Sequence, residues 1–61
     1  MTKLRTLFED NIITDQTLLK IDTGAEILRG HWHNARILEL MDRMVESYKV
    51  TDDGIMVIIL V

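Results

Sequence analysis

The stretch Val45–Val61, VESYKVTDDGIMVIILV, predicts two β-strands joined by a tight turn. Residues 45–50 and 55–61 are rich in β-branched side chains, and the TDDG sequence at 51–54 has the composition of a turn. The second strand is apolar without alternation, which is typical of a strand that is covered on both faces. We therefore expect it to lie centrally in a sheet, or to present one face to another subunit.

A second hairpin is predicted upstream, where Asp22-Thr23-Gly24 separates residues 17–22 from residues 25–33. Alternation in the later strand divides its side chains between two faces. The expected core face carries Leu28, Gly30 and Trp32, and the opposite face carries Ile27, Arg29, His31 and His33. Both histidines are therefore expected to point away from the core.

Two segments have the apolar spacing of short helices. In residues 2–10, TKLRTLFED, one stripe is formed by Leu4, Leu7 and Phe8. We expect Thr2 to cap this helix and Asn11 to end it in the left-handed conformation.

Residues 35–44, ARILELMDRM, carry a longer stripe formed by Ile37, Leu40, Met41 and Met44. We expect Asn34 to cap this second helix, Glu39 and Arg43 to form a surface ion pair, and the helix to end near residues 42–44.

These elements predict one domain, residues 1–61, of the α+β class. We expect a small antiparallel β-sheet of about four strands in two hairpins, with one or two short helices on one face. A chain of 61 residues buries only about 60% of the surface that its unfolded form exposes. Because the chain has no cysteine, disulfides do not stabilise it, and we expect it to form a homodimer.

Charge and composition restrict the location and the partners. Ten acidic and seven basic residues are interspersed and give a net charge of −3, which argues against nucleic-acid binding. The longest apolar run, residues 55–61, is far shorter than the roughly 20 residues of a membrane-spanning helix. Glu9 and Asp10 follow Lys3 and Arg5, where a secretory signal peptide has an apolar run. We expect a cytoplasmic protein that does not associate with a membrane.

The segment Arg29–Asn34, RGHWHN, holds both histidines and the single tryptophan. His31 and His33 are two potential metal ligands, whereas zinc sites take at least three from the protein. Asp52 and Asp53 are explained by turn chemistry, and the chain has no nucleotide-binding, hydrolase or metalloprotease motif. We therefore expect no bound metal, no cofactor and no enzymatic activity.

Trp32 has two interpretations, because it either fills the core or lies partly exposed as part of an interaction surface. Aromatic and arginine side chains are enriched at the energetic centres of protein interfaces. The candidate partner-binding residues are Arg29, His31, Trp32, His33, Arg36 and Tyr48.

Three segments together resemble a known group of proteins: residues 3–10 (KLRTLFED), 18–30 (LLKIDTGAEILRG) and 41–60 (MDRMVESYKVTDDGIMVIIL). In this pattern the chain resembles small acidic proteins of similar length and unknown function that are encoded by phages and prophages of Gram-positive bacteria. The segment HWHN departs from the group, in which a plainer polar segment is expected. The resemblance implies an accessory protein that binds a host protein and modulates or inhibits it.

The leading functional prediction is a non-catalytic protein-interaction module that contacts its partner through residues 29–33 or through a free sheet edge. One alternative is a nucleic-acid-associated regulator with a local patch formed by Arg29, His31, Trp32, Arg36 and Arg43. The other alternative is a small metal-dependent enzyme.

Overall fold

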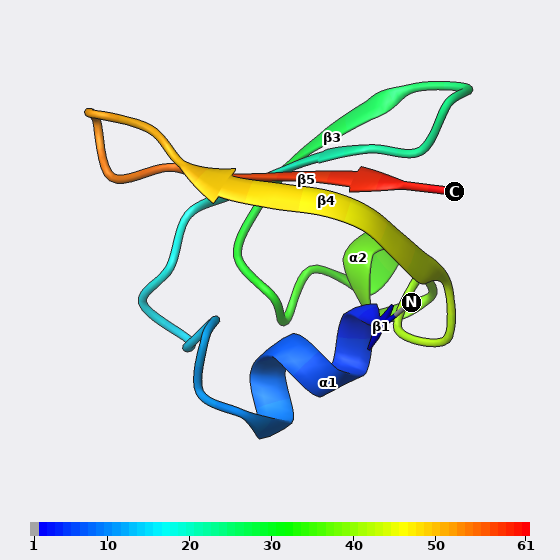
Figure 1. Cartoon of the computed structure of the whole chain (residues 1–61), viewed down its shortest axis with the longest axis horizontal. Helices are drawn as coiled ribbons and strands as arrows, with labels where there is room; N and C mark the ends of the chain where they lie inside the picture. Colours follow the sequence, from blue (N-terminus) through cyan, green and yellow to red (C-terminus); the bar gives the residue numbers. More distant parts are fainter. Residues whose placement is uncertain (1) are drawn as a thin grey trace.

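The computed structural model describes residues 2–61 and contains one five-stranded sheet with two short helices. The strands are β1 (Thr2–Lys3), β2 (Leu19–Asp22), β3 (Ile27–Gly30), β4 (Met44–Val50) and β5 (Met56–Leu60), and the helices are α1 (Leu4–Glu9) and α2 (Ala35–Leu38). Both helices lie on the same side of the sheet (Figure 1). The predicted α+β class, with short helices on one face, is therefore confirmed.

The strand order is β1-β4-β5-β2-β3. Both predicted hairpins are confirmed, since β2 pairs antiparallel with β3 and β4 pairs antiparallel with β5. The last strand is central, as expected. The prediction of a wholly antiparallel sheet is wrong at one pairing, because β2 and β5 run parallel, with Leu19 beside Met56 and Ile21 beside Ile58.

Burial explains why these two strands meet in the centre of a mixed sheet. Leu19 and Ile21 of β2, and Met56, Ile58 and Leu60 of β5, are each no more than 4% exposed. Side by side and in register, they form one continuous apolar layer beneath the helices. Turn chemistry determines the pairing within each hairpin, but it does not determine which strands of two hairpins become neighbours.

Helix α1 begins without the predicted threonine cap. Thr2 belongs to β1, and Lys3 precedes the helix without a capping hydrogen bond from its side chain. The amide nitrogens of Leu4 and Arg5 instead donate to the carbonyl oxygens of Arg43 and Met41, over 2.9 and 3.0 Å. Backbone carbonyls from residues 41–43 thus satisfy amides that the first helical turn leaves unpaired.

The predicted end of α1 is confirmed, because Asn11 follows the helix with a φ of 60°. The cap of α2 is also confirmed, since the side-chain oxygen of Asn34 accepts from the amide of Arg36 at 2.9 Å. However, α2 ends at Leu38, several residues before the predicted end near residues 42–44. Tighter turns follow, in which the amides of three residues each donate to the carbonyl three residues earlier, and residues 41–44 contact the start of α1 and β1.

The core lies between the sheet and the helices. Its ten buried hydrophobic residues are Leu4, Leu7, Ile13, Leu19, Ile21, Ile37, Val45, Met56, Ile58 and Leu60. The sequence did not place Ile13, which lies in the loop after α1, where its amide donates to the Leu7 carbonyl at 3.0 Å. Within residues 2–61, neither helix has the length and apolar character that crossing a membrane requires.

The Arg43 side chain joins the ends of β2 and β5. Its guanidinium donates to the carbonyl oxygen of Val61, just after β5, at 3.0 Å, and to that of Thr23, just after β2, at 3.3 Å. The predicted ion pair between Arg43 and Glu39 is not formed within the described residues. Because α2 ends at Leu38, Glu39 and Arg43 do not lie one helical turn apart, which is the spacing that the predicted pair requires.

Replacing Arg43 with alanine (Arg43→Ala) is expected to lower the free energy of unfolding by about 1–3 kcal/mol, because two charge-assisted hydrogen bonds are lost. The matched control is Arg5→Ala, which removes only an exposed ion pair to Asp42 and should cost about 0–1 kcal/mol. Urea denaturation followed by circular dichroism measures both values. Equal losses in the two variants would contradict the structural role of Arg43.

Candidate functional site

The predicted strand from residue 25 to His33 ends early, at Gly30, whose φ is +143°. The chain then turns into α2, and the Asn34 amide donates to the His31 carbonyl at 3.0 Å. Trp32 is half-buried, and its ring centroid lies 5.9 Å from that of Phe8. Trp32 therefore packs against the core and stays partly exposed, and a turn, not strand alternation, places it there.

His31 and His33 are both exposed and lie on the same side of this turn. Their rings are stacked, with centroids 5.9 Å apart and an interplanar angle of 11°. The part of the chain that the structure describes contains no group of three or more His, Cys, Asp or Glu side chains suited to hold a metal ion. Within residues 2–61, the two imidazoles therefore have no third potential metal ligand beside them.

The structure brings together only some of the six predicted site residues. Tyr48 lies opposite Ile58, on the core side of the sheet, whereas Arg29 lies opposite Lys20, on the other side. Two strands also separate β4 from β3 in the sheet. Tyr48 therefore does not belong to the same surface as Arg29, and the contiguous part of the prediction is the turn that holds His31, Trp32 and His33.

The basic patch considered for nucleic-acid binding is also divided. Arg36 forms an ion pair with Glu26, and Arg43 donates to the carbonyl oxygens at the strand ends. Of the three arginines in this patch, Arg29 alone has a side chain with neither an ion pair nor a hydrogen bond within residues 2–61. One unpaired guanidinium is a weak basis for binding phosphates, which requires several neutralising cations.

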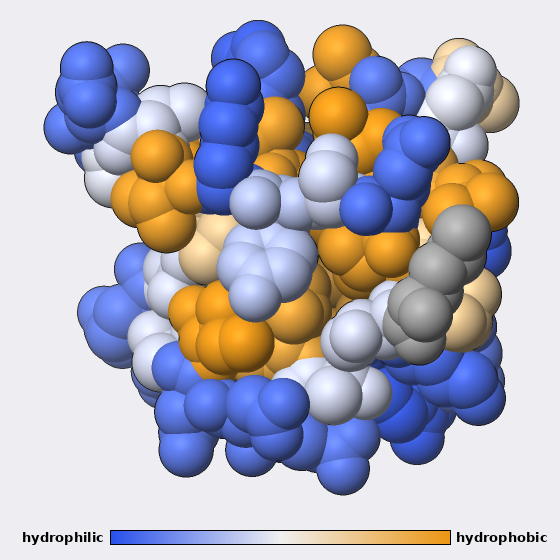
Figure 2. All heavy atoms as spheres, in the orientation of Figure 1, coloured by the Kyte–Doolittle hydropathy of each residue, from blue (hydrophilic) through white to orange (hydrophobic). Residues whose placement is uncertain are grey.

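A different surface stands out on the side of the sheet opposite the core, which no helix covers (Figure 1). We call this surface the open face and define it by Leu18, Lys20, Ile27, Arg29, Ile55 and Ile59. Leu18, Ile27 and Ile59 are 40%, 54% and 37% exposed. In Figure 2, hydrophobic side chains stand between hydrophilic ones along the upper margin, above the strands. The open face therefore combines exposed aliphatic side chains with charge.

Lysine and arginine side chains lie in one row across the open face. Lys20 lies opposite Arg29 on one side and beside Val57 on the other, and Val57 lies opposite Lys49. Like charges placed directly opposite each other on adjacent strands repel. Neither Lys20 nor Arg29 forms an ion pair with any described residue.

The nearest acidic residue on the same face is Asp22, two positions after Lys20 in β2. Its Oδ1 accepts a hydrogen bond from the Gly24 amide at 2.9 Å. This carboxylate stabilises the turn between β2 and β3, which is a common role for aspartate. The two cations of the open face are consequently left to solvent or to another molecule.

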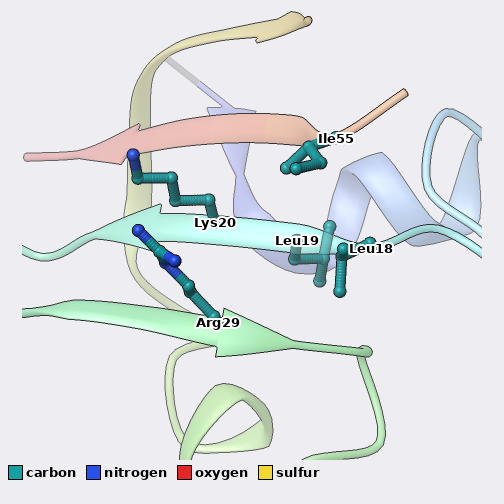
Figure 3. Close-up of a pocket in the computed structure, with 5 residues that line it drawn as sticks. All are labelled: Leu18, Leu19, Lys20, Arg29 and Ile55. Carbon is teal, nitrogen blue, oxygen red and sulfur yellow. The ribbon is translucent and has the colours of Figure 1, made fainter. Parts of the chain in front are cut away.

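A hollow of about 180 Å³ lies on the open face and is lined by Leu18, Leu19, Lys20, Arg29 and Ile55. Figure 3 shows Lys20 and Arg29 extending in the same direction, with Leu18 and Ile55 at the opposite end. Small-molecule sites usually measure about 300–1,000 Å³. The size of this hollow suits a side chain of another protein better than a metabolite.

A second hollow, of about 450 Å³, lies beside Trp32 and is lined by Phe8, Asn11, Ile13, Thr14 and Asp15 as well. It connects the predicted turn with the loop after α1. Phe8 and Ile13 take part in the core at this point. The exposed part of Trp32 therefore faces this hollow, and the buried part contributes to stability.

Of the open face, sequence reasoning identified only Arg29 as a functional candidate and missed Leu18, Lys20, Ile27, Ile55 and Ile59. The available signal was the apolar character of Leu18 and Ile27 at positions that alternation assigns to the solvent side of their strands. The apolar run at 55–61 carried the same signal, since one face of it could meet another molecule.

Comparison of the chain with models of known protein families, with curated proteins and with solved structures finds no match. The function is therefore inferred from the surfaces that the fold presents.

Phe8→Leu is expected to shift the fluorescence emission of Trp32 to longer wavelength, because the indole loses the ring that shields it. The free energy of unfolding should fall by about 1 kcal/mol, as for other losses of an aromatic contact. Emission spectra measure the shift, and Tyr48→Phe is the control that should leave the emission unchanged. An unchanged spectrum in Phe8→Leu would contradict the contact.

Proposed function

We propose that this protein is a non-catalytic protein-interaction module that binds its partner through the open face. The observation that carries the proposal is a sheet face with exposed aliphatic side chains and two unpaired cations, left uncovered by the helices. Exposed apolar surface that is bordered by polar groups marks interaction sites in soluble proteins. Binding there would occlude the surface of the partner, which requires no chemical step.

A protein partner accounts for the open face better than a nucleic acid does. Proteins that bind single strands stack bases on aromatic side chains, whereas Phe8, Trp32 and Tyr48 all lie away from this face. The net charge of −3 also opposes binding to a polyanion. Aliphatic side chains between cations are instead matched by an apolar protein surface that carries carboxylates.

The resemblance to small acidic phage and prophage proteins supports an accessory role. We propose that the partner is a host protein and that the complex forms in the cytoplasm, which suits a chain without cysteine. In this proposal the protein modulates or inhibits its target by covering a surface that the target uses.

Self-association is proposed to use a strand edge and not the open face. Strand β1 pairs only with Met44 and Val45 of β4, so the part of β4 from Ser47 to Val50 is a free edge among the described strands. Strand β3 is the edge on the other side of the sheet. Unpaired backbone groups on an edge are a template for pairing with a second copy.

If the homodimer forms, light scattering is expected to give twice the chain mass of 7.1 kDa. Val50→Lys should convert this dimer to a monomer, because an added lysine on an edge strand opposes pairing. Ile12→Lys, in the loop after α1, is the control that should remain dimeric. A wild-type monomer would contradict the proposed dimer, and a dimeric Val50→Lys variant would place the pairing at β3.

A photo-crosslinking amino acid at Ile59 is expected to form a specific adduct in lysate of the host cell, because this residue lies on the open face. The matched control carries the same amino acid at Ile12, which has almost the same exposure, 38% against 37%. Gel electrophoresis and mass spectrometry detect the adduct. An adduct formed equally by both variants, or by the Ile12 variant alone, would contradict binding at the open face.

A further inference from the structure

We infer that the open face binds an amphipathic helix of the partner, which places a carboxylate on Lys20 and Arg29 and an aliphatic side chain against Leu18 and Ile55. This inference rests on the proposed function, because it names the chemistry of the segment that the interaction module recognises.

The charge arrangement indicates a carboxylate. Lys20 and Arg29 face each other directly across β2 and β3, without an ion pair to any of residues 2–61. A carboxylate between them removes the repulsion and forms charge-assisted hydrogen bonds with both groups. Asp22, on the same face, accepts from the Gly24 amide and forms no ion pair with Lys20 or Arg29, so both cations are free to bind an acid of another molecule.

The apolar end of the hollow indicates which kind of side chain lies next to that carboxylate on the partner helix. Leu18 and Ile55 lie at the end opposite the direction in which Lys20 and Arg29 extend (Figure 3). Leu18 and Lys20 are two positions apart on one strand face, which corresponds to about 7 Å. Residues three or four positions apart on a helix lie about 5–6 Å from each other. A leucine and a glutamate at this helical spacing therefore match the hollow and the cations.

A helix suits this surface better than an extended peptide. An extended segment lying on a sheet face leaves its backbone amides and carbonyls without partners, whereas a helix satisfies its own. The sheet is covered by helices on one side only (Figure 1). A partner helix on the other side completes a helix, sheet and helix arrangement, which is a stable way to bury both faces of a sheet.

A second copy of this chain is a poorer occupant of the open face. A two-fold interface brings the same patch of both subunits together. Face-to-face packing about an axis that passes near Lys20 and Arg29 would therefore bring these cations close to the same cations of the other copy. An acidic helix avoids this repulsion.

The test titrates the isotope-labelled protein with a synthetic helical peptide of about 15 residues, cross-linked internally because isolated helices of this length are marginal. The peptide carries leucines on one face and glutamates three or four positions from them. Backbone amide shifts are expected to change in β2, β3 and β5, with a Kd below about 1 mM. The Kd should rise with salt concentration, because both cations are partly exposed.

Matched variants of the protein and of the peptide isolate the carboxylate contact. Lys20→Met and Arg29→Met keep the aliphatic stems, and each is expected to weaken binding about tenfold. Lys3→Met, at an exposed lysine of the edge strand β1, should leave the Kd unchanged. Replacing the glutamates of the peptide with glutamine should weaken binding of the wild-type protein by a similar factor.

Several results would overturn the inference. These are the absence of amide shifts up to millimolar peptide, equal binding of the glutamine peptide, or shifts confined to residues 31–36. With the last result the interaction module would stand, with its site at the turn that holds Trp32. Salt-sensitive binding of a single-stranded oligonucleotide at Lys20 and Arg29, without peptide binding, would overturn the proposed function as well.

Discussion

The parallel pairing of β2 with β5 is the constraint on which the rest of the structure depends. It places Leu19 and Ile21 in register with Met56 and Ile58, and this layer makes up much of the core. Each hairpin alone is too small to be stable in water. Joined at these two strands, the hairpins form a surface wide enough for α1, α2 and the loop around Ile13 to cover.

The small size of the helices explains why one face of the sheet stays uncovered. Helices α1 and α2 contain six and four residues, and both are used on the core side. Residues 2–61 form no further element on the opposite side, so exposed aliphatic side chains remain there. The proposed interaction surface rests on the two cations of this face, Lys20 and Arg29, which form no ion pair with any of residues 2–61.

Residues 41–43 likewise take part in more than one long-range contact. Their carbonyls satisfy the first amides of α1, and the Arg43 side chain joins the ends of β2 and β5. This explains why the second helix is shorter than its apolar stripe predicts. Local periodicity favoured a helix there, but Met44 and Val45 are extended and pair with β1, so the chain leaves the helical conformation before them.

The sequence by itself determined the α+β class, both hairpins, the cap at Asn34 and the burial of Leu4 and Leu7, because these depend on turn chemistry and periodicity within short segments. It also indicated the inward position of Trp32. Only the tertiary structure decided the parallel pairing, the early end of α2 and the separation of Tyr48 from Arg29. It alone assembled the open face. Arg29 lies in β3, and Leu18 and Ile55 directly precede β2 and β5, and burial across the whole chain decides which of these strands are neighbours.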